Sequence, residues 1–255
     1  MKTKTLLLGL LALFLSATGA SQTILPPWNV KPTAEQLIQH DGFSVSYNNI
    51  TKCPNWVSWE LTPEEAAAEA VGRTDFFTTD PLVSGPQAEY SDYTRNPYGL
   101  DRGHMAPSAD FRWSRSANEQ TFYLTNICPQ DHTLNEGLWL ELEQRCRAWA
   151  KRYNTAVQII CGPIHSKNPN TIGKNKVWVP EAFFKIVLMT IGDKRYSITF
   201  IFPNKSLDIQ EDIFNYLSTS EEINRKTGLD TRWLNTSSHP GKGYPFDIPW
   251  KKPKR

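Results

Sequence analysis

The sequence lacks the short motifs that mark several common classes of hydrolase and metal site. It has no Gly-x-Ser-x-Gly element, which argues against a serine hydrolase of the α/β type. It has no His-x-x-x-His or His-Glu-x-x-His element, which argues against a zinc hydrolase. No two cysteines are spaced as Cys-x-x-Cys, which argues against a zinc knuckle and a thioredoxin-like redox site. Any catalytic chemistry must therefore rest on other residues.

Long apolar segments are also missing after the first twenty residues. Residues 1–20 contain two lysines near the start, an apolar run over residues 6–15 and small residues at 17–20. This order is typical of a secretory signal peptide, and the run is shorter than the ~20 residues that span a bilayer. A short buried helix is the alternative. The first cysteine is Cys53, so no lipid-anchor acceptor lies near residue 20. We expect a secreted or periplasmic protein without a membrane anchor.

Net charge is small as well. The chain has 28 Lys and Arg against 26 Asp and Glu, a formal charge of +2. Residues 1–20 hold two lysines and no acid, so their removal brings the formal charge to zero. A neutral chain gives no global electrostatic attraction for nucleic acid. Evidence for such a partner must come from particular residues.

The cysteine count is low but even. The four cysteines are Cys53, Cys128, Cys146 and Cys161. In an exported protein this number fits two disulfides, with three possible pairings. The sequence does not choose among them. We slightly favour Cys146–Cys161, because a helix that runs directly into a strand brings such positions together.

What the chain does contain is enough apolar residues for one core, since 39% of its 255 residues are hydrophobic. There is no internal repeat and no strong linker. We expect a lead-in segment over residues 21–40, one domain over 41–235 and a Pro- and Lys-rich tail over 236–255. That tail is either a solvated terminus or a nucleic-acid-binding arm.

Hydrophobic periodicity predicts both strands and helices. Strands are expected over residues 43–47, 56–61, 122–127 and 156–161, and as a hairpin over 183–190 and 196–202. Helices are expected from Thr62 onward, over 135–152, around 213–217 and over 221–226. Residues 72–120 have little periodicity and read as a long loop-rich region, which is often functional. The fold class is α+β, a single domain with a mixed or antiparallel sheet flanked by helices.

Three segments carry candidate chemistry. The first is Asp101-Arg102-Gly103-His104, whose histidine can accept a proton from water near neutral pH. The second, residues 122–130, contains Thr-Asn and Pro-Gln, and the third begins at Asn135 and runs into a helix. A lone histidine in a loop is usually only solvated. The ordered set, however, resembles the DNA/RNA non-specific endonuclease family over about residues 43–232.

The resemblance implies a ββα-metal motif, in which two strands and a helix surround a divalent cation. It implies that His104 is the general base and that Asn135 is the direct protein ligand of Mg²⁺, which Mn²⁺ or another hard divalent cation can replace. The metal would neutralise charge on the scissile phosphate and stabilise the departing 3′ oxygen. The implied activity is hydrolysis of DNA and RNA with little sequence specificity, leaving 5′-phosphate ends.

Further residues match the family pattern. Glu143 matches an acid that holds the waters of the metal, and lies about 80° from Asn135 on a helix of ~3.6 residues per turn. Arg147 matches an arginine that supports the phosphate, and Asn126 a residue near the metal. Arg102 would order the loop or contact phosphate. Arg73 aligns more loosely and is expected to bind substrate.

Less specific interpretations exist for several of these residues. Glu143 and Arg147 are four residues apart, so they would also suit an ordinary surface ion pair. Asn135 would also suit a helix N-cap. A non-catalytic nucleic-acid-binding protein on the same fold is the main alternative function. A colicin-like HNH nuclease would share the metal motif, but its paired metal histidines are missing. DNA and RNA, bound through their phosphates, are the expected partners.

Overall fold

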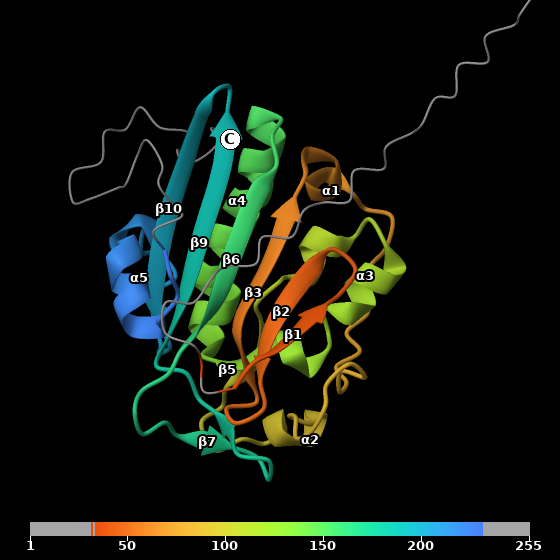
Figure 1. Ribbon diagram of the computed structural model, residues 1–255, viewed down its shortest axis with the longest axis vertical. Helices are drawn as coiled ribbons and strands as arrows, with labels where there is room; N and C mark the ends of the chain where they lie inside the picture. The colour runs from red at the N-terminus through yellow and green to blue at the C-terminus, as the bar shows by residue number, and fades with distance from the viewer. Residues whose placement is uncertain (1–31, 33, 232–255) are drawn as a thin grey trace, which may run out of the picture.

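A six-stranded antiparallel sheet forms the body of the protein in a computed structural model that describes residue 32 and residues 34–231 (Figure 1). The expected signal peptide and the Pro- and Lys-rich tail lie outside these residues. The strand order is β1-β2-β3-β6-β9-β10. The strands are β1 (Gln36–Gln39), β2 (Phe43–Asn48), β3 (Cys53–Leu61), β6 (Val157–Ile164), β9 (Ala182–Ile191) and β10 (Lys194–Pro203).

Helices pack against both faces of this sheet. The long helix α4 (Leu140–Tyr153) lies along one face, and its Trp149 joins a core cluster with Ile159 of β6. The short helix α5 (Ser220–Thr227) covers the other face, where Ile223 packs in a cluster with Ile160. Successive residues of β6 thus point to opposite sides, as a strand requires. The α+β class predicted from the sequence is confirmed.

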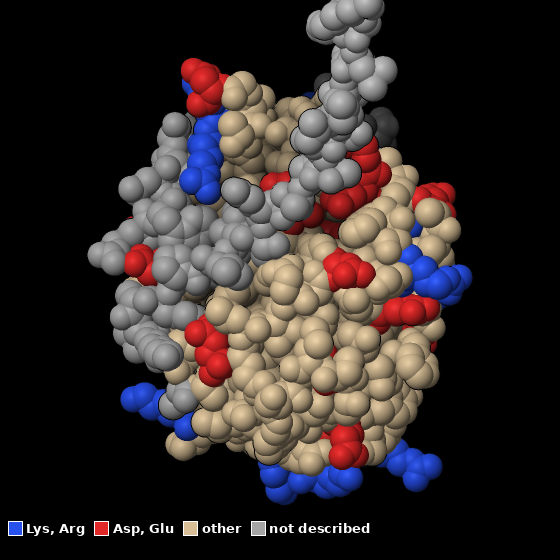
Figure 2. Space-filling model, turned by 45° about the vertical axis from the view of Figure 1, so that its right-hand side comes forward, with Lys and Arg blue, Asp and Glu red and all other residues tan. Residues whose placement is uncertain are grey.

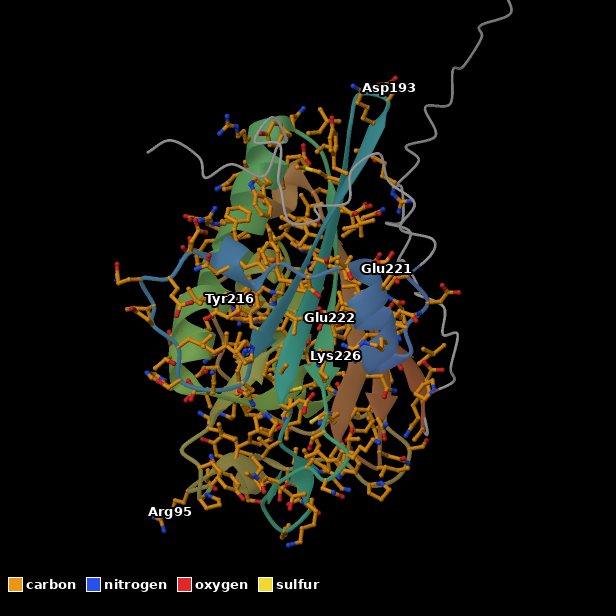
Figure 3. All side chains as sticks on the ribbon, turned by 90° about the vertical axis from the view of Figure 1, so that its left-hand side faces the viewer. Arg95, Asp193, Tyr216, Glu221, Glu222 and Lys226 are labelled. Atoms are coloured by element: carbon orange, nitrogen blue, oxygen red, sulfur yellow. The ribbon has the colours of Figure 1, made fainter. Side chains whose placement is uncertain are left out.

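Two labelled residues mark opposite ends of the described structure (Figure 3). Figure 3 shows Asp193 at the tip of the β9–β10 hairpin and Arg95 at the opposite end. It also shows Glu221, Glu222 and Lys226 on α5. This helix follows a Thr219 cap and ends at Gly228, whose φ of 76° is a left-handed conformation that suits glycine.

A second, two-stranded sheet carries the segment Asp101-Arg102-Gly103-His104. It pairs β4 (Asp101–His104) with β5 (Ile127–Gln130), so that His104 lies opposite Ile127. The remaining short elements are α1 (Pro63–Ala67), α2 (Tyr90–Tyr93), η1 (Ser108–Phe111), α3 (Arg115–Gln120), η2 (Leu124–Asn126), β7 (Thr171–Ile172), β8 (Val177–Trp178) and η4 (Ile213–Tyr216). Residues 72–120 are therefore less irregular than expected, because β4 and short helices lie within them.

Three element boundaries differ from the prediction. β1 lies inside the expected lead-in segment, so the sheet begins before residue 41. The strand expected over 122–127 is a 3₁₀ turn followed by β5. β6 continues through Gly162 to Ile164, and a Cβ on Gly162 would lie 2.5 Å from the carbonyl oxygen of Asn55. Glycine here permits a close approach to β3 rather than ending the strand.

The helix expected over 135–152 is interrupted near its start. Residues Leu134–Trp139 form η3, a π-helical turn, and α4 follows it directly. Gly137 departs from helical geometry, with φ and ψ both at −108°. The angular positions of side chains before and after Gly137 therefore do not follow from the geometry of one regular helix.

The cysteines do not form the expected disulfides. All four are buried and carry free thiols, so the favoured Cys146–Cys161 pairing is wrong for this structure. Burial raises the pKa of both of these thiols to about 12. None of the described helices is long and apolar enough to cross a membrane.

Candidate active site

A polar pocket lies where three segments meet, namely the loop over residues 73–77, the start of β4 and the η3 turn. Its volume is about 260 Å³. The lining residues are Arg73, Asp75, Phe77, Leu100, Asp101, Arg102, His132, Asn135 and Glu136. The face of the molecule in Figure 2 shows no broad basic surface, because its Lys and Arg side chains lie in separate groups near the edge of the view.

His104 lies at the end of β4, behind the wall of this pocket. Its exposed fraction is 8%. The ring packs edge-on against Phe122 at 4.9 Å and against Phe77, a lining residue, at 5.4 Å between centroids. Atom Nε2 is buried and has no hydrogen-bond partner among the described residues. The side chain is thus held by packing, with one nitrogen left for chemistry.

Electrostatics keep this histidine neutral. Burial is the main reason that the pKa of His104 falls to about 3, and the charges of Arg73 and Arg102 lower it further. A neutral imidazole can accept a proton, whereas an imidazolium cannot. The surroundings of His104 therefore keep it in the unprotonated form that a general base requires.

The backbone around His104 is fixed from two sides. Asn126 is fully buried, and its amide donates to the carbonyl oxygens of Ala106 and Thr121 and accepts from the N–H of Ala106. Asn126 therefore holds the chain just after His104, and it does not line the pocket. On the other side, a Cβ on Gly103 would lie 2.0 Å from Oε1 of Gln130. Only glycine fits at that position.

Asn135 lies in the pocket and is oriented by a carboxylate. Its Nδ2 donates to Oδ2 of Asp101 at 3.0 Å, which leaves the amide oxygen for another partner. The N-cap of η3 is Thr133, so Asn135 is not the helix cap. Asn135, Asp101 and Glu136 offer oxygen atoms, the donors that Mg²⁺ prefers while it keeps much of its water. The donor set fits such a cation, although no cluster of three His, Cys, Asp or Glu able to hold a metal occurs in the described part of the chain.

Two arginines give the pocket positive charge. The guanidinium of Arg102 lies between the rings of Phe77 and Tyr90, at 4.7 and 5.0 Å from their centroids. Arg73 packs over Phe122 at 5.1 Å and bonds Asp75 at 3.2 Å. Planar guanidinium groups suit phosphate oxygens, and stacking on rings limits their motion. Both arginines line the pocket, and both were expected from the sequence to be candidates for contact with substrate.

Glu143 and Arg147 are not in the pocket. Glu143 lies 3.7 Å from Nζ of Lys185, and Arg147 bonds Asp110 at 2.7 Å. Both pairs are in the interior, so the surface ion pair considered from the sequence is also not found. The expected 80° separation assumed one regular helix from Asn135 onward, and the break at Gly137 removes that assumption.

Two residues linked to this site were missed in the sequence. Trp139 donates its indole N–H to the carbonyl oxygen of His104 at 3.2 Å, and nothing in its local sequence indicates this contact. Lys185 stacks on Trp139, with Nζ 3.8 Å from the ring centroid. The sequence feature that could have identified Lys185 is its position as the single charged residue in the apolar run of residues 182–189.

Comparison with known proteins agrees with this geometry. The family model for DNA/RNA non-specific endonuclease matches residues 21–233. Human mitochondrial endonuclease G is 31% identical over 210 residues, covering 78% of this chain and 70% of its own length. Nuclease C1 of Cunninghamella echinulata is 30% identical over 211 residues, covering 77% of this chain and 82% of its own length.

A solved structure shares the fold. A chain in the crystal structure of an EndoG/EndoGI complex superposes with a TM-score of 0.72 at 28% identity, covering 78% of this chain and 86% of that one. The family model spans more than four fifths of the sequence and includes every residue of the pocket. The chain therefore belongs to the DNA/RNA non-specific endonuclease family and is an endonuclease.

Proposed function

We propose that the protein hydrolyses phosphodiester bonds of both DNA and RNA with little sequence preference, with His104 as general base and a divalent cation held by Asn135. The observation that carries this proposal is a pocket lined by two arginines and an oxygen-donor set, with His104 packed against its lining residue Phe77. A general base, phosphate-binding cations and a metal position are the parts that phosphodiester hydrolysis needs.

The proton-transfer step belongs to His104. Its unpartnered Nε2 takes a proton from a water molecule, which then attacks the phosphorus atom. The bond from phosphorus to the 3′ oxygen breaks, so the product carries a 5′-phosphate end. Phe77 and Phe122 enclose the imidazole and exclude other water, which keeps it unprotonated until substrate arrives.

The cation is expected to be Mg²⁺, with Mn²⁺ as a substitute. When bound, it supplies positive charge for the scissile phosphate and the departing oxygen. Asn135 would hold it through its amide oxygen, and Asp101 keeps the amide in that orientation. Asp101 and Glu136 would accept hydrogen bonds from its waters, a role that the resemblance assigned to Glu143.

Substrate binding is assigned to Arg102 and Arg73 rather than to Arg147, whose guanidinium is bonded to buried Asp110. Phosphate contacts fix the position of a nucleic acid but carry no direct sequence information. Low sequence preference and acceptance of both sugars follow from this mode of binding.

The experiment is digestion of plasmid DNA and of RNA by the purified protein, with sequencing of the cleaved ends. We expect activity with Mg²⁺, loss in excess EDTA, recovery after Mg²⁺ is restored, and varied end sequences carrying 5′-phosphate. Binding of both polymers without cleavage would favour the non-catalytic alternative. A narrow consensus at the cut sites would contradict the proposed lack of specificity.

We also propose that the protein is exported and that residues 1–20 are removed. The support is the basic start, apolar run and small residues of that segment. N-terminal sequencing of the protein recovered from culture medium or periplasm tests this proposal. A retained residue 1 in protein from inside the cell would contradict it.

A further inference from the structure

Lys185 is a charged residue in the middle of the protein core. It lies in β9 with an exposed fraction of 1%, and its neighbours in that strand include Phe184 and Ile186. Its Nζ atom has no hydrogen-bond partner within the described residues. Burial of an ammonium group is unfavourable unless other groups compensate it. Such a residue therefore requires a physical explanation.

Three groups compensate the charge, namely Glu143, the indole of Trp139 and, more distantly, the indole of Trp59, whose centroid lies 6.0 Å from Nζ. Oε1 of Glu143, on α4, lies 3.7 Å from Nζ, which is too long for a hydrogen bond but close enough for strong attraction in a buried site. The Nζ atom also lies over the indole ring of Trp139, 3.8 Å from the ring centroid. This is a cation–π interaction at short range. Lys185 thus joins an acid on α4 to the aromatic residue at the start of that helix.

Trp139 in turn contacts the catalytic strand. Its Nε1 donates to the carbonyl oxygen of His104 at 3.2 Å, and its side chain is almost fully buried. The ring can make this bond only when its plane and rotation are fixed. The cation on its face provides one such restraint. A continuous set of contacts therefore runs from Glu143 through Lys185 and Trp139 to the backbone of His104.

Stability alone does not account for this arrangement. A buried ion pair can often be replaced by apolar residues of similar size without loss of stability, because the desolvation penalty offsets the attraction. A methionine at position 185, combined with glutamine at position 143, would fill the same space beside Trp139 without leaving a lone buried charge. What methionine would not supply is a directional attraction for the face of the indole.

We propose that Lys185 is a positioning residue for His104, acting through the indole of Trp139, with Glu143 balancing its charge. This inference rests on the proposed role of His104 as general base. It also gives Glu143 a function in the interior, in place of the one at the metal that the family pattern suggested. Neither residue touches the substrate.

The test compares two paired substitutions, each of which removes a buried cation together with the acid on α4 that lies beside it. Glu143→Gln with Lys185→Met removes the pair without leaving a lone buried charge. The matched control is Glu141→Gln with Arg145→Met, because Arg145 is also a buried cation, bonded to Glu141 at 2.6 Å and stacked on Phe214 at 5.1 Å. The contacts of this control pair do not lead to β4.

We expect the first pair to lower kcat about 10- to 100-fold with little change in KM, as a small misplacement of a reacting group does. The control pair should keep the kcat of the wild type, even if its melting temperature changes. The single variant Lys185→Arg retains the positive charge, so we expect its kcat to lie between that of the first pair and that of the wild type. Wild-type kcat in the first pair, or an equal loss in both pairs, would overturn the proposal.

A double-mutant cycle locates the path. Trp139→Phe removes the indole N–H, so adding the Glu143 and Lys185 changes to it should cause no further loss. Losses that multiply would mean that Lys185 does not act through Trp139. Should Trp139→Phe fail to fold, the paired substitutions and the Lys185→Arg variant still decide the outcome.

A second measurement does not need nuclease activity. In the folded proteins, NMR resonances of the Trp139 indole and the His104 ring should move in the first pair and stay in place in the control pair. If the wild type cleaves neither DNA nor RNA, the proposed function fails, and these resonances alone decide whether Lys185 positions His104. Unchanged resonances in both pairs would contradict the inference.

Discussion

Nδ2 of Asn135 donates a hydrogen bond to Oδ2 of Asp101 at 3.0 Å. The bond crosses from η3 to the first residue of β4, so it connects the proposed metal ligand to the strand that carries the general base. Nδ1 of His132 lies 2.9 Å from the same oxygen. Asp101 is therefore the residue through which the proposed metal site and the strand that carries His104 would be coupled.

The first prediction concerns this coupling. Asp101→Ala should lower the Mg²⁺ affinity about 10- to 100-fold, the usual effect of losing the partner that orients a metal ligand. Isothermal titration calorimetry gives the affinity directly. Asp75→Ala is the matched control, because Asp75 lines the same pocket but bonds Arg73. Equal losses in the two variants would argue for a general effect of negative charge.

The second prediction concerns the base. His104→Ala should lose about 10²- to 10⁴-fold in kcat, the range typical of general-base catalysis. His132→Ala, a change at an exposed pocket histidine, should lose much less. Circular dichroism confirms that both variants fold. Near-wild-type turnover of the His104 variant would rule out the mechanism.

The third prediction is the pH dependence of stability at His104. The pKa of His104 is about 3 in the folded protein and 6.5 when unperturbed, so the unfolded chain binds the extra proton between these values. The free energy of unfolding should therefore fall as the pH drops from 6.5 toward 3. Urea unfolding at several pH values, compared with His104→Phe, measures this contribution. An identical pH profile for the two proteins would show that His104 is not buried as described.

The fourth prediction has the opposite sign. Burial raises the pKa of Glu143 from 4.5 to about 7, although Lys185 and Arg147 oppose the shift. The folded protein keeps this proton up to about pH 7, where the unfolded chain has already lost it, and above that pH the Glu143 carboxylate is charged and pairs with Lys185. The contribution of Glu143 to stability should therefore decline as the pH rises from 4.5 to 7. Glu143→Gln should remove that decline, which parallel urea unfolding experiments on the two proteins would detect.

The fifth prediction concerns phosphate contacts. Arg102→Ala should weaken binding to DNA of different sequences by a similar factor, and should reduce the slope of log affinity against log salt by about 1. Fluorescence anisotropy with Ca²⁺ or in the His104→Ala background avoids cleavage. Arg95→Ala, at the far end of the molecule from the β9–β10 hairpin, tests whether any surface charge has the same effect. A sequence-dependent loss would indicate base recognition by Arg102.

Local signals explain what the sequence predicted well. The β9–β10 hairpin follows from two apolar runs around Gly192, and α5 from its Thr219 cap and Gly228 end. Such features depend on residues close together in the chain. The segments that resemble the family contain Arg102, His104 and Asn135, of which Arg102 and Asn135 line the pocket while His104 packs against its lining residue Phe77.

Features that depend on distant contacts were not predicted. β5 begins five residues later than expected, because the Asn126 side chain takes the backbone groups of Ala106 and Thr121 and holds the preceding turn. The interior positions of Glu143 and Arg147 were not foreseen, because no periodicity argument detects the break at Gly137. The pairing of Lys185 on β9 with Glu143 on α4 could not be predicted from the spacing of residues close together in the sequence.

The contact between Gly103 and Gln130 restricts how this nuclease can change under selection. A methyl group at position 103 would overlap the Gln130 side chain, whose amide is itself buried. Position 103 can accept alanine only after position 130 has become small. Mutational trajectories that pass through the family signature should therefore show a fixed order, with Gln130 changing first. Random libraries selected for activity should contain the double substitution and the change at 130, but not Gly103→Ala alone.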